Sequence, residues 1–438
     1  MKQHTFYLLL VILSFLLPLA IAWGEEPFSL KECYTLARAQ SEKLQIGTAE
    51  IAIAEAQYRQ ALSAIYPQLM FGVEQRFRDN EDFGRVTRAG SSVDDAADSS
   101  GGARESLGKT QLEGVARLTQ PLFTGFRDMY ISRGMKKTEQ ALNQEHTRQR
   151  ELLFLDVAEL FFQYILFDSD LKVFEKTEEL LRERIKALAE FVALGKSRES
   201  EVLAAQSELA DLNSTKERTT GALASTQELL AFLTGRASAE LSPKRESVAG
   251  VHLGLEESLA RARQRADLKA SELRVEAQQH FVTSAERQRW PRLELEGNAY
   301  PFEDPDRNRD WDVLLRFELP IFEGGRIEAK TEEQLAKLRI AELSRKERER
   351  IAEREVRVAF SELSAARAEI AALRKLLNTS KRNFTSQSKD YELGVVTNLE
   401  VLQSIRQVNE AQRRLIGAQV RSELNYHRLQ VASGGMDL

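Results

Sequence analysis

Apolar residues recur at alternating steps of three and four along two long tracts that contain no proline, residues 127–193 and 326–392. The stepping is carried in the first tract by Val157, Leu160, Tyr164, Phe167, Leu171 and Phe174, and in the second by Val356, Ala359, Leu363, Ala366, Ile370 and Leu373. Sustained 3-4 stepping is the seam pattern of a coiled coil. Each tract is therefore predicted to be one helix, roughly 100 Å long if straight, that packs along its whole length.

Four shorter segments alternate between apolar and polar residues, which predicts β-strands. The apolar positions are Leu69, Phe71 and Val73; Leu112, Gly114, Ala116 and Leu118; Leu293, Leu295, Gly297 and Ala299; and Val313, Leu315, Phe317 and Leu319. A membrane barrel uses strands of about 9–11 residues that are apolar outward and polar inward, but a soluble sandwich also alternates. Aromatic residues near the segment ends favour the membrane, where they would form interfacial girdles. These are Tyr66, Phe123, Trp290, Tyr300, Trp311 and Phe322. Four strands cannot close a barrel, and an open edge in lipid leaves backbone groups unpaired, so a membrane role requires several chains.

The helical and strand patterns occur in the same order in two halves of the chain, which indicates an internal duplication. "LGKSRESEVL" at 194–203 matches "LGVVTNLEVL" at 393–402, and "YPQL" at 66–69 matches "WPRL" at 290–293. The first repeat is expected over 23–235, with a helix at about 30–65, a β-hairpin at 66–122, the long helix at 127–193 and a last helix at 197–234. The second is expected over 255–434, with a helix at about 255–289, a β-hairpin at 290–322, the long helix at 326–392 and a last helix at 398–433. Residues 236–254 are the expected linker and 435–438 a tail. The Gly/Ser/Asp-rich stretch at 79–108, present only in the first half, is predicted to be a surface loop.

Each half joins its second strand to its long helix through a similar phrase, "QPLFTGFR" and "LPIFEGGR". Both phrases pair a proline (Pro121, Pro320) with a glycine four residues later (Gly125, Gly324). Pro320 can end a strand because it has no N–H to donate, and Gly324-Gly325 let the chain change direction. Phe126 stands where the second copy has Gly325, so the two joints need not bend alike.

The first 22 residues resemble a secretory signal, with a basic start at Lys2, an apolar run at 6–21 and a small-x-small site that predicts cleavage after Ala22. A membrane anchor is disfavoured because the run is short and lacks a stop-transfer flank. Further along, no segment approaches 18 uninterrupted apolar residues, so a membrane role would depend on the strands.

Composition excludes several classes of function. A formal net charge of −5 argues against a nucleic-acid surface. The single cysteine, Cys33, permits no intrachain disulfide and is expected to be a buried or bystander thiol. The sequence has no H-E-x-x-H, paired cysteines, phosphate-binding glycine loop or nucleophile elbow, so neither an enzyme nor a cofactor is expected.

The doubled joint, the doubled "LG……VL" turn and the paired strand starts together resemble the TolC family of outer-membrane efflux proteins, over about residues 28–434. The resemblance implies a mixed α and β membrane protein: a homotrimer in which long antiparallel helical hairpins form a periplasmic α-barrel. Four transmembrane strands per chain would contribute to a 12-stranded β-barrel in outer-membrane lipid. The resemblance also implies an exit channel of a tripartite export system, fed by an inner-membrane transporter and a periplasmic adaptor. The channel would serve small-molecule efflux or would pass polypeptides, as in type I secretion. The joints would connect the two pore walls.

The resemblance also assigns roles to the two helix–helix turns at the periplasmic tip. The family meets its adaptor there, at positions that match Leu194, Gly195, Lys196 and Ser197 and Leu393, Gly394, Val395 and Val396. A plain glycine-terminated helix end would explain either copy alone.

A periplasmic aperture is implied beside these turns. Two rings of acidic residues narrow it in closed family members; the matching positions hold Glu400 and the neutral Gln403. The family ties the aperture shut with a tyrosine and an arginine that bind an acidic residue. Tyr391 and Glu201 match two of these partners, but the arginine position holds Val396, which predicts a partial lock. The competing hypothesis for the whole chain is a secreted soluble coiled-coil scaffold without channel activity.

Overall fold

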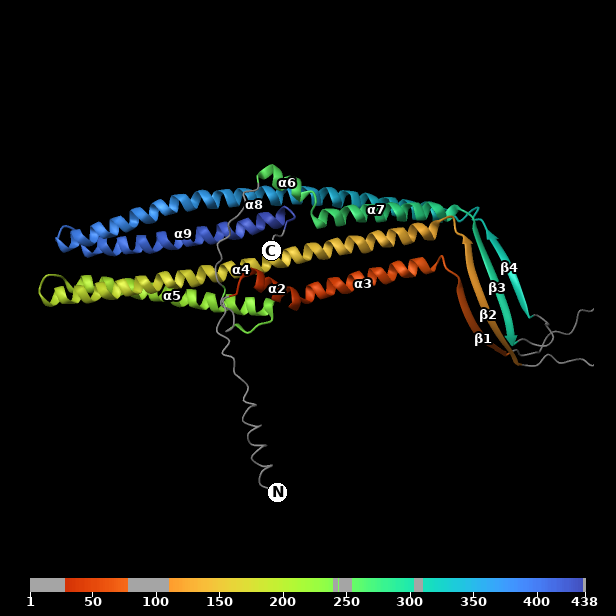
Figure 1. Cartoon of the computed structure of the whole chain (residues 1–438), viewed down its shortest axis with the longest axis horizontal. Coiled ribbons are helices and arrows are strands. Elements are labelled where there is room, and N and C mark those ends of the chain that lie inside the picture. Colours follow the sequence, from red (N-terminus) through yellow and green to blue (C-terminus); the bar gives the residue numbers. More distant parts are fainter. Residues whose placement is uncertain (1–27, 78–109, 239–242, 244–253, 303–309, 436–438) are drawn as a thin grey trace, which may run out of the picture. The chain divides into compact units, whose positions relative to one another are not determined.

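The computed structural model describes residues 28–77, 110–238, 243, 254–302 and 310–435 (Figure 1). The predicted signal segment with its cleavage after Ala22 and the loop at 79–108 lie outside the described residues. The chain divides into two compact units. We call residues 1–48, 144–268 and 347–438 the helical unit, and residues 49–143 and 269–346 the sheet unit.

The two proline-free tracts are single helices, as their apolar stepping predicted. Helix α4 spans Arg127–Ala193 and α8 spans Arg326–Glu392, 67 residues each. Each is followed, after a short turn, by a second long helix: α5 at Glu199–Thr234 and α9 at Asn398–Ala432. The latter two helices begin and end within two residues of the positions expected from the sequence.

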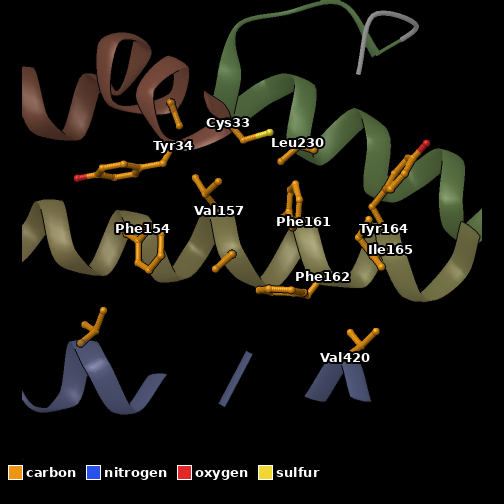
Figure 2. Close-up of a cluster of buried hydrophobic side chains, with 13 residues drawn as sticks. Cys33, Tyr34, Phe154, Val157, Phe161, Phe162, Tyr164, Ile165, Leu230 and Val420 are labelled. Atoms are coloured by element: carbon orange, nitrogen blue, oxygen red, sulfur yellow. The ribbon is translucent and has the colours of Figure 1, made fainter. Parts of the chain in front are cut away.

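The helical unit has its main core where four helices meet. Figure 2 shows Phe154, Val157, Phe161 and Ile165 of α4 packed against Cys33 and Tyr34 of α2 (Leu30–Gln40) and Leu230 of α5. Val420 of α9 closes the cluster from the other side of α4. The stepping residues Val157, Val356 and Phe174 are almost fully buried, so the seam pattern identified the packing faces correctly.

Cys33 belongs to this core as a free thiol. Burial raises the pKa of the thiol to about 12, so it stays protonated at neutral pH. The expectation of a buried, unreactive cysteine agrees with this environment.

The opening helix of each half is broken, which corrects the expectation of one helix at 30–65 and another at 255–289. In the first half α2 ends at Gln40 and α3 (Glu42–Ser63) begins after Ser41, whose backbone is extended and whose Oγ accepts from Leu44 N at 3.4 Å. In the second half α6 (Leu255–Ala262) and α7 (Ala266–Glu286) are separated, and a 3-10 turn η2 (Arg287–Arg289) follows.

The second break centres on Arg265, which is almost fully buried. Its guanidinium makes two hydrogen bonds to Asp267, one to Glu355 at 2.7 Å and one to the carbonyl of Ala432 at 3.2 Å. A buried guanidinium needs such partners because an unpaired charge away from water is costly. Because of this break, the Arg265 side chain contacts the final turn of α9 and does not lie on an exposed helix surface.

The sheet unit contains one antiparallel sheet with the strand order β1-β2-β3-β4. The strands are β1 at Gln68–Phe77, β2 at Thr110–Phe123, β3 at Arg292–Phe302 and β4 at Trp311–Glu318 (Figure 1). The register pairs apolar residues with apolar residues, for example Leu69 with Leu118 and Leu295 with Leu315. One face of the sheet is therefore apolar across all four strands.

The apolar face is largely uncovered in the single chain, with Phe71 62% and Phe317 64% exposed. The opposite face carries a polar network centred on Asn298, which bonds Arg117, Glu296 and Asp312 at 3.0–3.1 Å. The alternation predicted from the sequence is present, and polar residues of that network are partly shielded from water by one another.

Both joints have a left-handed backbone with positive φ. The sequence, with Phe126 in one copy and Gly325 in the other, had allowed the two joints to bend differently. Gly125 and Phe126 have φ of 62° and 60°, and Gly324 and Gly325 have 61° and 82°. Phe126 is the only non-glycine with positive φ among the described residues, a conformation that costs a side-chain-bearing residue about 1–2 kcal/mol. Its ring packs edge-on against Phe123 at 5.4 Å.

The joints differ in what surrounds them. A Cβ on Gly125 would lie 2.5 Å from Cβ of Trp290, whereas Gly324 and Gly325 have open space. Pro320 follows the end of β4, but Pro121 lies inside β2 and pairs with Glu294 beside a bulge. A proline at a bulge removes no ladder hydrogen bond.

Within the described ranges, none of the helices is apolar over a stretch long enough to cross a membrane.

Candidate functional site

The two helix–helix turns of the helical unit have nearly identical backbones. Gly195 and Gly394 have φ of 69° and 73° and follow the ends of α4 and α8. The N–H of Gly195 bonds Val192 O at 2.9 Å and that of Lys196 bonds Phe191 O at 2.8 Å; Gly394 and Val395 repeat both bonds at 2.9 Å. This is the Schellman arrangement, in which glycine satisfies the last carbonyls of the helix.

Most of the turn residues expected to meet a partner are exposed. Leu194, Gly195, Lys196, Leu393, Gly394 and Val395 are exposed, and Ser197 and Val396 are half-buried. Leu194, Leu393 and Val395 are between 66% and 77% exposed, so the first turn presents one large apolar side chain to solvent and the second presents two.

The helices that leave the two turns begin differently. Thr397 and Glu400 form a capping box at the start of α9: the Glu400 carboxylate accepts from Thr397 N at 2.7 Å and Thr397 Oγ1 at 3.0 Å. At the start of α5 the N-cap position is Arg198, which makes no capping bond with its side chain. The Glu400 carboxylate thus stabilises its own helix.

Glu201, by contrast, binds across to the other helix pair. The hydroxyl of Tyr391, near the end of α8, donates to Glu201 Oε2 at 2.8 Å, and Ser197 Oγ donates to the same oxygen at 2.9 Å. Burial and the hydrogen bond to Glu201 raise the pKa of Tyr391, so the phenol stays protonated and remains a donor at neutral pH. The structure therefore brings together Tyr391 and Glu201, two of the four predicted aperture residues.

Arg184 of α4 completes this group, and sequence reasoning missed it. Its guanidinium carbon lies 3.9 Å from the centroid of the Tyr391 ring, and its Nε donates to Asn398 Oδ1 at 3.0 Å. Asn398 in turn donates to the carbonyl of Glu201 at 3.2 Å. Burial lowers the pKa of Arg184, yet a guanidinium stays charged, so the ring faces a cation.

We call Arg184, Glu201, Tyr391 and Asn398 the tip cluster. It joins α4 and α5 to α8 and α9. The position at which the family resemblance implies an arginine holds Val396, in the turn between α8 and α9, whereas Arg184 comes from α4, 17 residues before Glu201 in sequence (201 − 184). No sequence motif marks Arg184 as a member of this cluster, because only the packing of α4 against α8 places it over Tyr391.

Glu400 and Gln403 occupy exposed positions on α9. In the described part of the chain, neither shares a hydrogen bond or an ion pair with the tip cluster. The expected aperture residues therefore separate into a bonded pair and two exposed side chains.

Among the described residues, no group of three or more His, Cys, Asp or Glu side chains could hold a metal ion.

Solved structures of membrane proteins, two of the following three from the outer membrane, share this fold. A membrane protein from Pseudomonas aeruginosa matches with a TM-score of 0.80 and 20% identity over 93% of this chain and 90% of its own. VceC from Vibrio cholerae matches with a TM-score of 0.78 and 17% identity over 93% and 96%. The CmeC outer membrane channel of Campylobacter jejuni matches with a TM-score of 0.76 and 17% identity over 95% and 90%.

The sequence itself was compared with protein families and with curated proteins. No curated protein matched it. The family described as outer membrane efflux protein matches residues 33–236 and 258–435, which is most of the chain. The chain therefore belongs to the outer membrane efflux protein family, whose members are efflux channels of the outer membrane.

Proposed function

We propose that three copies of this chain form an exit channel of a tripartite export system. An inner-membrane transporter and a periplasmic adaptor would deliver small molecules or polypeptides to it, and the channel would pass them to the cell exterior. No covalent chemistry is assigned to the chain, and the energy would come from the transporter.

The observation that carries the proposal is the uncovered apolar face of a sheet with two open edges. In the described residues β1 pairs only with β2 and β4 only with β3. Unpaired backbone groups at such edges cost several kcal/mol each in lipid, so the edges must pair with other chains. Four strands from each of three chains would close a barrel of twelve, the number that the family resemblance suggests.

The polar face of the sheet supports a water-filled interior. If the apolar face contacts lipid, the network of Arg117, Glu296, Asn298 and Asp312 faces the inside of the barrel. The joints at Gly125 and at Gly324-Gly325 would then be the places where each strand pair passes into the helical wall.

The helix–helix turns would form the periplasmic tip. We assign adaptor contact to the exposed apolar residues Leu194, Leu393 and Val395, and closure of the aperture to the tip cluster. Because Arg184 supplies a cation to Tyr391, we propose a complete lock within each chain in place of the partial lock that Val396 suggested. Glu400 and Gln403 would line the opening, where one acidic residue per chain favours cations.

A matched pair of substitutions on β4 tests the membrane assignment. Phe317→Arg puts a charge on the apolar face, whereas Leu314→Arg puts the same charge on the polar face of the same strand. In lipid, Phe317→Arg should cost about 2–4 kcal/mol and Leu314→Arg much less. Recovery of the wild-type protein as a heat-labile oligomer in the outer-membrane fraction, and loss of that oligomer in Phe317→Arg alone, are the expected results.

The rival hypothesis of a secreted soluble scaffold makes the opposite prediction. A soluble wild-type protein, or equal tolerance of both arginines, would exclude the channel. The choice between small molecules and polypeptides would depend on the transporter, so it is tested by identifying the transporter that co-purifies with this chain, deleting it and measuring which substrate accumulates in the cells.

A further inference from the structure

A cavity of about 430 Å³ lies in the sheet unit, between the two joints. It is lined by the ends of β3 and β4, by the 3-10 turn η2 and by the first residues of α4 and α8. Its volume falls in the range of about 300–1,000 Å³ that is usual for small-molecule sites. The proposed function assigns it no role.

The lining of this joint cavity is rich in arginine. Four guanidiniums, from Arg127, Arg287, Arg292 and Arg326, line it together with two carboxylates, from Glu318 and Glu323. Four positive and two negative charges leave a net charge of +2. The cavity therefore favours an anion.

Two of the four arginines are already neutralised by carboxylates. Arg127 pairs with Asp128 at 2.8 Å, and Arg326 pairs with Glu323. Their charges hold the local backbone together and are not available to a ligand without loss of those bonds.

The other two arginines, Arg287 and Arg292, have no carboxylate partner in the described part of the chain. Arg287 lies over the Trp290 ring, with its guanidinium carbon 4.4 Å from the centroid. Arg292 stands opposite Glu318 in the strand register, yet no ion pair joins them among the described residues. Both are half-buried, so a bound anion would meet two donor groups in a partly desolvated site.

The surroundings of the cavity show what kind of anion fits. Leu319, Pro320 and Trp290 contribute apolar surface to the lining. The next two residues, Ile321 and Phe322, are 91% and 87% exposed, among the most exposed large apolar side chains of the described chain. A ligand with an anionic head and an apolar tail would contact both the arginines and these side chains, whereas a free anion would contact the arginines alone.

We propose that the joint cavity binds the phosphate of an anionic phospholipid, with Arg287 and Arg292 as its donors. Guanidiniums match phosphate oxygens with two parallel N–H bonds, and Trp290 orients Arg287 for that contact. The acyl chains lie along Ile321 and Phe322. A bound lipid thereby covers the second joint, where a Cβ on Gly324 or Gly325 would meet no described atom within 4 Å.

Quenching of Trp290 fluorescence measures this binding. The chain has three tryptophans, and Trp23→Phe with Trp311→Phe leaves Trp290 alone. The full-length protein in detergent is titrated with phosphatidylglycerol that carries brominated acyl chains. We expect saturable quenching, at least about tenfold weaker in Arg287→Gln/Arg292→Gln because two charge-assisted bonds are lost.

Two further variants separate site binding from surface charge and from misfolding. Arg289→Gln removes a neighbouring arginine that pairs with Glu328 at 3.6 Å and does not line the cavity, and it should leave the affinity within about twofold. Glu318→Gln removes a negative charge from the lining and should tighten lipid binding, a gain that a misfolded protein cannot give.

Three results would overturn the proposal. If Arg289→Gln weakened lipid binding as much as Arg287→Gln/Arg292→Gln does, the attraction would be a nonspecific effect of surface charge. If quenching of Trp290 did not saturate, no lipid would occupy the cavity. Competition by glycerol 1-phosphate as strong as that by the lipid would identify a free phosphate compound as the ligand.

Discussion

The two helix–helix turns of the helical unit share one backbone but use their acidic residues differently. In the first turn, Glu201 accepts hydrogen bonds from Ser197 and from Tyr391 of the other helix pair. In the second, Glu400 accepts from Thr397, three residues away, and caps its own helix. The first of these similar turns thus supplies a tie between helix pairs, and the second supplies a local helix start. A similar sequence therefore does not give the two turns the same mechanical role.

Removal of the tie should have the largest effect. Glu201→Ala deletes the acceptor shared by Tyr391 and Ser197, and a hydrogen bond to a charged group is worth about 1.5–3 kcal/mol. If the tie closes the channel, the ratio of closed to open channels should fall about tenfold to a hundredfold. This fall would be measured as a higher single-channel conductance in planar bilayers. Thr397→Ala, which breaks the capping box of the second turn but removes no charge from the opening, should leave the conductance close to wild type, and equal increases in both variants would contradict the distinction.

Loss of the cation should have the next largest effect. Arg184→Gln removes the guanidinium over Tyr391 and should weaken the closed state by about 1–2 kcal/mol. Arg182→Gln is the matched control, because Arg182 lies two residues away on α4, its side chain is 66% exposed, and it pairs with Glu178. A conductance of Arg184→Gln equal to that of Arg182→Gln would show that the lock does not use the cation.

The two turns should also respond differently to loss of the N-cap residue. Thr397→Ala breaks the capping box and should destabilise α9 by about 1 kcal/mol, whereas Arg198→Ala removes a side chain that caps nothing and should be nearly neutral. The thermal midpoint followed by circular dichroism in detergent measures both. A larger fall of the thermal midpoint in Arg198→Ala than in Thr397→Ala would contradict the assignment of the side-chain cap to the second turn.

The shared backbone predicts the smallest difference between the turns. Gly195→Ala and Gly394→Ala each place a Cβ at positive φ in open space, so each should cost about 1 kcal/mol, by the same amount. Thermal midpoints that differ clearly between the two variants would show that one turn is held by contacts that the other lacks.

Sequence alone predicted the long helices and the strand faces because both depend on local periodicity. The tracts at 127–193 and 326–392 contain no proline and step by three and four, and no tertiary contact is needed to recognise them. The same holds for Leu69, Phe71 and Val73, which alternate along β1 and are exposed in the chain.

The features that sequence missed depend on partners far away in the chain. The break before α7 forms because Arg265 binds the carbonyl of Ala432, 167 residues later, and no local pattern marks Arg265 as a helix breaker. Arg184 lies on an ordinary helix, and only the fold brings it over Tyr391 and beside Asn398, which in turn bonds the carbonyl of Glu201. The family resemblance points to position 396 for an arginine. It cannot reveal that an arginine of α4 lies over Tyr391.

The single-channel conductance of the wild-type protein and of Tyr391→Phe tests the central claim most directly. This substitution removes one hydroxyl with its hydrogen bond to Glu201 and keeps the ring beneath Arg184. We predict a small conductance for the wild type and a severalfold larger one for Tyr391→Phe, with Tyr426→Phe, which changes a tyrosine elsewhere in the helical unit, close to wild type. An absence of channels in the wild-type protein would contradict the proposed function, and an unchanged conductance in Tyr391→Phe would contradict the lock.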